Sequence, residues 1–193
     1  MVIAVTAVVL KKRQNRTSKA PTPPPPPPPA KAAVPQKLET ATVTPVNHIF
    51  VSHVEEDVEI ASEIAKGLEK AGYKAWYYER DSVGGFSYLL QTMQAIERSQ
   101  AVILLISPNS LSSNQVTKEV VRTHEAGKPF IPLLLGISHV EFQQRQPEWR
   151  EAIGSATSIS IPKQGVSVIL PRITDGLASL GVKKSGEFKE NPV

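Results

Sequence analysis

Residues 101–106 read Ala-Val-Ile-Leu-Leu-Ile, and this unbroken apolar run decides the fold class. A strand that faces solvent on one side alternates apolar with polar residues, and no position here is polar. The run therefore predicts a strand that is buried on both faces. Such strands are typical of the centre of a parallel sheet that helices cover on both sides.

Segments on either side of this strand alternate between strand and helix character. Apolar residues recur every three or four positions from Val58 to Ala71, which predicts a helix that Gly72 ends. Ser112 or Ser113 is expected to cap a later helix at its N-terminus. The same patterns predict strands at 48–52, 73–78, 101–106, 130–135 and 157–161, a loop at 80–85, and helices around 58–71, 89–96, 116–121 and 169–180.

This alternation predicts a flavodoxin-like α/β fold, with a doubly wound, five-stranded parallel sheet in the order 2-1-3-4-5 and helices on both faces. In such sheets ligands bind beyond the carboxyl ends of the strands, where the strand order reverses. The loops that begin at Ser52–His53 and Ser107–Pro108 are therefore the candidates for a site. No GxGxxG follows the first strand and no GxxxxGK[ST] occurs, which argues against the usual dinucleotide and P-loop sites. The third strand ends without an Asp, which excludes a phospho-accepting receiver domain.

The composition excludes several classes of site in this chain of 193 residues. It has no cysteine, so disulfides, thiolate zinc sites and cysteine nucleophiles are ruled out. Its four histidines lack HExxH spacing, and no metal is expected. Seven of the 22 Lys and Arg residues but only one of the 18 acids lie in residues 1–46, so residues 47–193 carry a net charge of −2. We therefore expect no nucleic-acid partner for the folded part.

Residues 1–19 combine an apolar tip, MVIAVTAVVL, with a basic cluster that starts at Lys11. A helix of that length rises about 15 Å, half the thickness of a bilayer core. One interpretation is the inner end of a longer membrane anchor, which would tether a cytoplasmic domain to the inner face of the plasma membrane. The other interpretation is an apolar tip without regular structure, and the sequence leaves both open.

Residues 20–46 contain the proline run from Pro23 to Pro29, which predicts a disordered, extended linker. Proline has a fixed φ and no N–H, so the run is expected to take polyproline II geometry. It serves either as a passive spacer or as a binding strip for a proline-recognition domain. The folded domain is then expected at 47–182, and a polar, disordered tail at 183–193.

A series of short motifs runs through residues 47–182. In order, they are Ile49-Phe50-Val51-Ser52-His53 with Asp57, Gly72-Tyr73 with Trp76, Arg80-Asp81 with Gly84-Gly85, Leu105-Ile106-Ser107-Pro108 with Ser110, and Glu119 ahead of Gly127-Lys128-Pro129-Phe130. In order and spacing the series resembles Toll/interleukin-1 receptor (TIR) domains, and bacterial members more than animal receptor adaptors. The resemblance implies a flavodoxin-like fold and association with itself or with other TIR domains.

The resemblance also implies one of two functions. Some TIR domains are enzymes that cleave the nicotinamide–ribose bond of NAD+, releasing nicotinamide and ADP-ribose or a cyclic variant, and others are adaptors without activity. In the bacterial members the implied role is defence signalling, switched on by self-assembly. NAD+ is then the substrate, and no cofactor is expected. The enzymes use a glutamate in the third helix, and Glu119 matches its position.

The other site residues follow from the same resemblance. Substrate contacts are expected at Phe86, His53, Ser52 and Gln115, and loop or assembly contacts at Arg80, Asp81, Gly84 and Gly85. Many active relatives carry Trp where Gln115 stands, which favours the adaptor reading, whereas Glu119 favours the enzyme. Trp76 and Tyr88 are expected to pack in the core.

The chemistry itself asks for little more than one carboxylate. The nicotinamide of NAD+ is cationic and leaves as a neutral molecule, so its departure needs no general acid, unlike the two-carboxylate glycosidases. A single carboxylate near the ribose can stabilise the positive charge that develops at the anomeric carbon.

Overall fold

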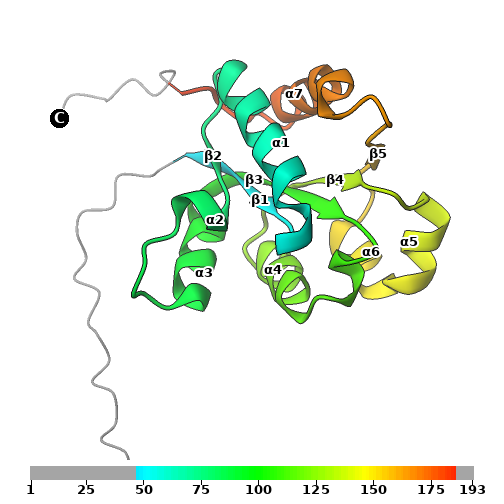
Figure 1. Ribbon diagram of the computed structural model, residues 1–193, viewed down its shortest axis with the longest axis horizontal. Helices are drawn as coiled ribbons and strands as arrows, with labels where there is room; N and C mark the ends of the chain where they lie inside the picture. Colours follow the sequence, from blue (N-terminus) through cyan, green and yellow to red (C-terminus); the bar gives the residue numbers. More distant parts are fainter. Residues whose placement is uncertain (1–46, 186–193) are drawn as a thin grey trace, which may run out of the picture. The chain divides into compact units, whose positions relative to one another are not determined.

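A computed structural model describes residues 47–185, which form a five-stranded sheet (Figure 1). The strand order is β2-β1-β3-β4-β5, and every neighbouring pair is parallel. This confirms the expected flavodoxin-like fold and its order. The strands are β1 (His48–Ser52), β2 (Ala75–Trp76), β3 (Ser99–Ile106), β4 (Phe130–Leu134) and β5 (Ile159–Ser160).

Helices cover both faces of the sheet, as the apolar central strand predicts. Figure 1 shows α1 and α7 over one face, and α3, α4 and α6 over the other. The α-helices are α1 (Val58–Lys70), α2 (Tyr78–Asp81), α3 (Tyr88–Arg98), α4 (Asn114–Glu125), α5 (His139–Arg145), α6 (Pro147–Ile153) and α7 (Leu170–Ser179). Short 3₁₀ turns lie at Glu55–Asp57, Ser110–Ser112 and Val166–Val168.

Successive side chains of β3 point to opposite faces of the sheet and divide the core into two layers. Ile103 packs with the residues of α1 and α7, whereas Leu104 packs with those of α3, α4 and α6. Both side chains are fully buried. The strand is therefore apolar at every position from Ala101 to Ile106 because neither face of the sheet meets water there.

Three strands are shorter than the sequence predicts, β4 by a single residue and β2 and β5 by more. The second was expected at 73–78, but β2 holds only Ala75 and Trp76, and the next residues turn into α2. The carboxylate of Asp81 accepts a hydrogen bond from the Tyr77 backbone N–H at 3.0 Å, which closes this turn. Arg80 and Asp81 therefore belong to a short helix, and the loop expected at 80–85 instead occupies residues 82–87. At the sheet edge, β5 is shortened to Ile159–Ser160.

Helices α5 and α6 had no counterpart in the sequence-based expectation. Ser138 caps α5 by accepting a hydrogen bond from the Glu141 backbone N–H at 3.1 Å, and Pro147 stands in the first turn of α6. Both helices have seven residues, too few for a clear helical period. Trp149, which is 1% exposed, fixes α6 against the core.

The described domain continues beyond residue 182. The side-chain amide of Gln100 donates to the Lys183 carbonyl at 3.0 Å and accepts from the Lys183 N–H at 2.9 Å. Ser185 donates its N–H to the Gly72 carbonyl at 2.7 Å. Lys183 and Ser185 of the expected tail are thus hydrogen-bonded to the domain. The expected tip at 1–19, the linker at 20–46 and the tail from 186 onwards lie outside the described residues.

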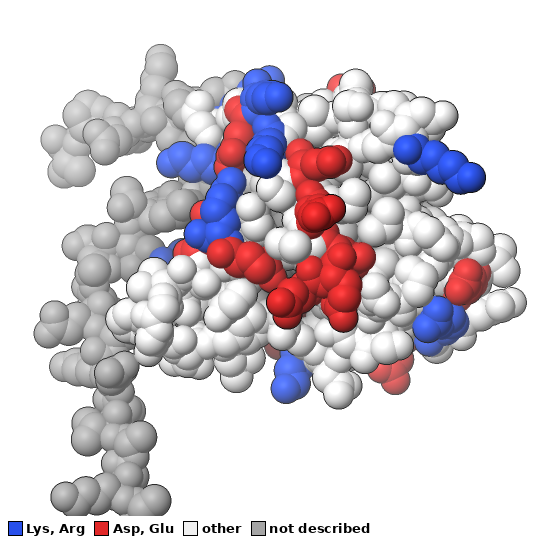
Figure 2. Space-filling view, in the orientation of Figure 1, with Lys and Arg blue, Asp and Glu red and all other residues white. Residues whose placement is uncertain are grey.

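The surface at the start of α1 is acidic, whereas the later turns of this helix carry the exposed Lys66 and Lys70. Figure 2 shows acidic side chains gathered in a band on the face that carries this helix. Glu55, Glu56, Glu59 and Glu63 are exposed there, along the start of α1. Such a band repels the phosphates of a nucleic-acid backbone. In residues 47–185, no helix is both long enough and apolar enough to cross a membrane.

Candidate active site

Glu119 lies at the centre of a hydrogen-bonded cluster near the carboxyl end of β1. Its side chain is 5% exposed, and each carboxylate oxygen accepts a hydroxyl donor. Ser52 Oγ, in the last residue of β1, donates to Glu119 Oε2 at 2.6 Å. The Tyr88 hydroxyl donates to Glu119 Oε1 at 2.8 Å. The structure therefore joins Ser52 and Glu119, two residues that are 67 positions apart in the chain.

Three elements bring this cluster together. Ser113, one of the two serines expected to cap this helix, caps α4 by accepting a hydrogen bond from the Val116 N–H. The helix then carries Gln115 and Glu119 one turn apart on the same face. Gln115 donates its side-chain amide to the Tyr88 hydroxyl, so both residues meet at Tyr88.

Tyr88 is the site residue that the sequence did not identify. It was expected in the core, but it is half-buried at the start of α3 and points its hydroxyl at Glu119. Its ring packs edge-on against Tyr78, with 4.2 Å between the ring centroids. Tyr88 directly follows the loop after the second strand, and this position could have marked it as a candidate, because that loop lies at the carboxyl end of the sheet, where ligands bind in such folds.

A cavity of about 310 Å³ opens between α3 and α4 beside this cluster. Glu119, Gln115 and Tyr88 line one part of it, and Leu89, Met93 and Ile96 give it an apolar wall. Ser52, His53 and Phe86 do not line it. The cavity thus offers one carboxylate beside an apolar surface, a combination suited to a ligand with both hydroxyl groups and a ring.

Burial raises the pKa of Glu119 above its ordinary value because a buried carboxylate loses its hydration. The donors Ser52 and Tyr88 and the nearby His53 oppose this shift because they stabilise the charged form. Burial and the charge of Glu119 raise the pKa of Tyr88, which therefore stays a neutral donor. The cluster holds a carboxylate that takes up a proton more readily than an exposed one.

His53 follows β1 but turns away from the cavity. Its Nε2 lies 2.9 Å from Glu79 Oε2, and its Nδ1 lies 3.1 Å from the Val51 carbonyl oxygen. Burial lowers the pKa of His53, but the hydrogen bond and charge of Glu79 outweigh this, so the pKa is raised overall. The same pair lowers the pKa of Glu79, against the effect of burial. The charge of His53 reaches Glu119 through space rather than by direct contact.

The loop at residues 82–87 holds three of the predicted residues. The side chain of Gln91 fixes the loop by hydrogen bonds to the backbone of Val83, at 2.6 and 3.2 Å. Phe86 is 52% exposed. Gly85 has a φ of 85°, which glycine adopts without strain, whereas Gly84 does not have a positive φ. No atom lies within 4 Å of a Cβ placed on either glycine, so this tip is open to solvent.

Arg80 and Asp81 serve a structural purpose in the described domain. Arg80 pairs with Glu69 at 2.6 Å and with Asp81 at 2.9 Å, and it donates to the Ala75 carbonyl at 2.5 Å. These contacts bind α2 to α1 and β2. The expected role of Arg80 and Asp81 in assembly stays a prediction.

The second candidate loop, which follows β3, forms hydrogen bonds that do not involve Glu119. Ser107 Oγ donates to Asp57 Oδ2 at 2.5 Å, and both side chains are buried. Ser110 Oγ accepts from the Ser107 N–H at 2.8 Å and so holds the exit from the strand. This loop fixes the start of α1 and does not reach Glu119. Within the described part of the chain, no group of three or more His, Asp or Glu residues is placed to hold a metal ion.

The sequence profile of the TIR domain family matches residues 49–161, which is more than half of the chain. The chain belongs to the TIR domain family. The match spans both the strand that ends at Ser52 and the helix that carries Glu119. No curated protein sequence matches the chain.

Solved structures of TIR domains share the fold. A metazoan TIR-STING receptor from C. gigas, in complex with 2',3'-cGAMP, is 26% identical with a TM-score of 0.55, over 74% of this chain and 41% of the receptor. The TIR domains of the activated Roq1 resistosome, which recognises the pathogen effector XopQ, are 18% identical with a TM-score of 0.54, over 68% of this chain and 99% of that one. The TIR domain of the Toll-related receptor TRR-2 from Hydra magnipapillata is 20% identical with a TM-score of 0.51, over 69% and 97%. This chain thus spans well under half the length of the C. gigas receptor.

Proposed function

We propose that this TIR domain is an NAD+ glycohydrolase in which Glu119 is the catalytic carboxylate. The TIR family includes enzymes that cleave NAD+. The observation that carries the proposal is the environment of Glu119, a buried carboxylate whose two oxygens accept from Ser52 and Tyr88 beside a cavity. This arrangement fixes the carboxylate in place before a substrate arrives, which is the condition for electrostatic stabilisation of a developing charge.

Ribose hydroxyl groups are the natural partners of this carboxylate. A hydroxyl of the nicotinamide ribose would take the place of the Tyr88 hydroxyl at Glu119 Oε1, while Ser52 continues to hold Oε2. As the bond to nicotinamide breaks, its electron pair leaves with the ring and positive charge develops at the anomeric carbon. The ionised Glu119 stabilises that charge, and water then adds to the carbon and releases a proton to solvent, which gives ADP-ribose. Attack on the anomeric carbon by a nucleophilic group of the same ADP-ribosyl unit, in place of water and with loss of its proton to solvent, would give a cyclic product instead.

Gln115 and Phe86 complete the proposed site in different ways. Gln115 lines the cavity and donates to Tyr88, so it is placed to contact a ribose hydroxyl or a carboxamide when Tyr88 moves. Phe86 lies on the exposed loop at 82–87, outside the cavity. We propose that it contacts substrate only after self-assembly, which is common among TIR domains. His53 acts at a distance, through its charge.

The rest of the expected role belongs to the same proposal. It includes a bacterial origin, a role in defence signalling, a cytoplasmic location with an N-terminal tether, and a partner for the run from Pro23 to Pro29. These points are supported by the sequence patterns alone.

Nicotinamide release by the full chain tests the proposal. The protein is incubated at high concentration with NAD+, and nicotinamide is measured by chromatography. Glu119→Gln keeps the shape of the side chain but not its charge, and we expect it to reduce release by about 100-fold or more. Glu125→Gln, on the exposed part of the same helix, is the matched control and retains activity.

The alternative function is a TIR adaptor without activity. One observation favours the adaptor: an exposed apolar stretch lies around the start of α3. Its members are all at least half exposed and are Val83, Phe86, Leu89 and Leu90. Exposed apolar stretches of this kind mark protein contacts. A folded wild-type chain that assembles but releases no nicotinamide would favour the adaptor, and in that case Gln115→Trp would test whether the missing ring is the cause.

A further inference from the structure

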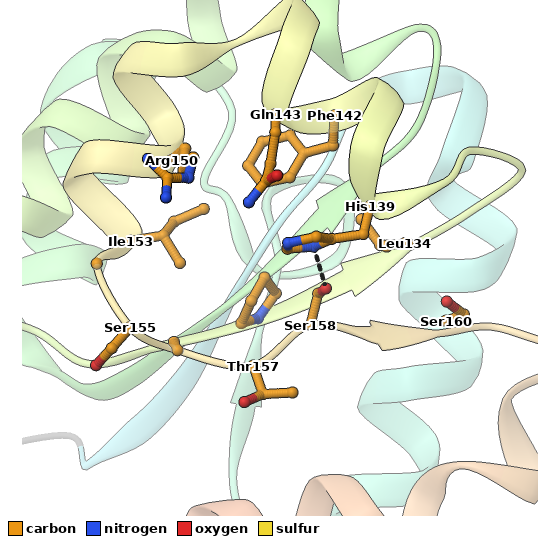
Figure 3. A pocket seen from close by; sticks show the side chains of 13 residues that line it. Leu134, His139, Phe142, Gln143, Arg150, Ile153, Ser155, Thr157, Ser158 and Ser160 are labelled. Atoms are coloured by element: carbon orange, nitrogen blue, oxygen red, sulfur yellow. Dashed lines mark hydrogen bonds between the residues drawn. The ribbon is translucent and has the colours of Figure 1, made fainter.

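A second cavity lies on the opposite side of α4, between α5, α6 and the edge of the sheet. Its volume is about 440 Å³, larger than the cavity at Glu119, and the two cavities share no lining residue. Its walls come from β4, from α5 and α6, and from the segment that leads into β5 (Figure 3). A cavity of this volume falls in the range of sites for small organic ligands.

The floor and the rim of this cavity differ in chemistry. Leu134, Phe142 and Ile153 are buried and form an apolar floor. The rim is polar and carries amide, imidazole and hydroxyl groups from His139, Gln143, Ser155, Thr157, Ser158 and Ser160. A ligand that fits both parts has an apolar or ring portion and a strongly polar portion.

The only charged lining residue apart from the titratable His139 is an arginine. Arg150 lines the cavity, and no acidic residue does. Although Glu148 and Glu151 lie near it in the sequence, Arg150 makes no ion pair with any residue of the described domain. Arg145 on the neighbouring helix, by contrast, pairs with Glu141 at 3.3 Å. The Arg150 guanidinium is therefore free to bind an anion.

Other donors share the same side of the cavity as Arg150. Figure 3 shows the polar ends of Arg150, Gln143 and His139 turned toward one space. The His139 Nδ1 lies 2.9 Å from Ser158 Oγ, which fixes the ring and directs Nε2 into the cavity. A planar guanidinium with a neighbouring side-chain amide matches the oxygens of a phosphate.

We propose that this cavity binds a phosphate monoester attached to a ring system, in the class of a nucleoside monophosphate. The phosphate is held by Arg150, with Gln143 as a further donor, and the ring portion lies over the apolar floor at Phe142. The cavity is separate from Glu119, so this site does not depend on the proposed NAD+ hydrolysis. The cavity is in contact with α4, the helix that carries Glu119, through α6. The Nδ1 atom of His124 in α4 lies 3.1 Å from the Ala152 carbonyl oxygen in α6.

Nuclear magnetic resonance of the ¹⁵N-labelled full chain tests the site. Amide shifts are followed during titration with AMP, with adenosine and with inorganic phosphate. We expect AMP to cause saturable shifts at residues 139–158, and adenosine and phosphate alone to bind about tenfold more weakly. Arg150→Gln is expected to weaken AMP binding by about tenfold or more because it removes a charged hydrogen bond to phosphate. Arg145→Gln, whose side chain does not line the cavity, is the matched control and binds AMP as the wild type does.

Three results would overturn the proposal. The first is that AMP shifts no amide in residues 139–158, the second is that Arg150→Gln binds AMP as tightly as the wild type, and the third is that inorganic phosphate binds as tightly as AMP. Glu119→Gln separates this site from the active site, because AMP binding at residues 139–158 is expected to persist in that variant. Loss of nicotinamide release in the same variant would leave this inference intact.

Discussion

Replacing Ser52 with alanine tests how the Glu119 carboxylate is held. The Ser52 hydroxyl donates to Glu119 Oε2 at 2.6 Å. Solvent water does not reach this position to replace the hydroxyl as a donor, because Ser52 is 1% exposed. A hydrogen bond to a charged group contributes about 1.5–3 kcal/mol. Since this bond favours the charged form, its loss should raise the proton affinity of Glu119 by about ten- to hundredfold. The pKa of Glu119, already raised by burial, should rise further.

The assay is a titration of the Glu119 side-chain carboxyl by ¹³C nuclear magnetic resonance, in wild type and in Ser52→Ala. Ser107→Ala is the matched control, because that buried serine donates to Asp57 and not to Glu119. We expect a shift of the Glu119 titration to higher pH in Ser52→Ala and an unchanged titration in Ser107→Ala. An unchanged titration in Ser52→Ala, or an equal shift in both variants, would refute the reasoning that this hydroxyl stabilises the carboxylate.

Three further predictions concern pH and stability. Glu79→Gln should remove the stability that the charged His53 contributes through its pair with Glu79. In the wild type this contribution is complete below the ordinary His pKa of 6.5 and is lost as pH rises through the raised pKa of His53. Melting temperatures measured across that range should therefore fall less steeply with pH in the variant, and identical slopes would contradict the pairing. Trp149→Ala should lower the free energy of unfolding by about 3–5 kcal/mol in a urea titration, because the side chain is fully buried; a loss below about 1 kcal/mol would mean that α6 does not need this anchor. Gly85→Ala should cost about 1–2 kcal/mol because φ is 85° there, whereas Gly84→Ala should be close to neutral, and equal costs would argue against this loop geometry.

The sequence was most informative where one requirement governs a whole element. The apolar run at 101–106 has no polar position, so it predicts a central strand, and the family motifs around it predict the strand order. Gly72 ends α1 with a φ of 93°, as its position after the helical pattern predicts. Such features depend on local sequence and on burial, both of which are visible in the residues.

Elements that depend on single contacts were less visible. The second strand ends early because Asp81 binds the Tyr77 N–H, and nothing in the apolar pattern of 73–78 shows that side-chain contact. Helices α5 and α6 are too short for periodicity, although Ser138 and Glu141 have the spacing of an N-terminal capping box. Capping residues were the stronger signal in this region.

The candidate site was predictable in part. Glu119 could be identified from its position in the family motif, and Ser52 from its place at the end of the first strand. Tyr88 could not be assigned, because a tyrosine at the start of a helix turns toward the core or toward a neighbouring helix according to the packing of both. Its direction depends on α4 and on Tyr78, which only the structure brings together.

The most direct test of the central claim compares the pH dependence of NAD+ cleavage with the titration of Glu119 in the same full-length protein. If the ionised carboxylate stabilises the developing positive charge, nicotinamide release at low substrate concentration should rise with pH along the same curve as the ionisation of Glu119 measured by ¹³C resonance. Nicotinamide release that is independent of pH across this titration, or that persists in Glu119→Gln, would contradict the account.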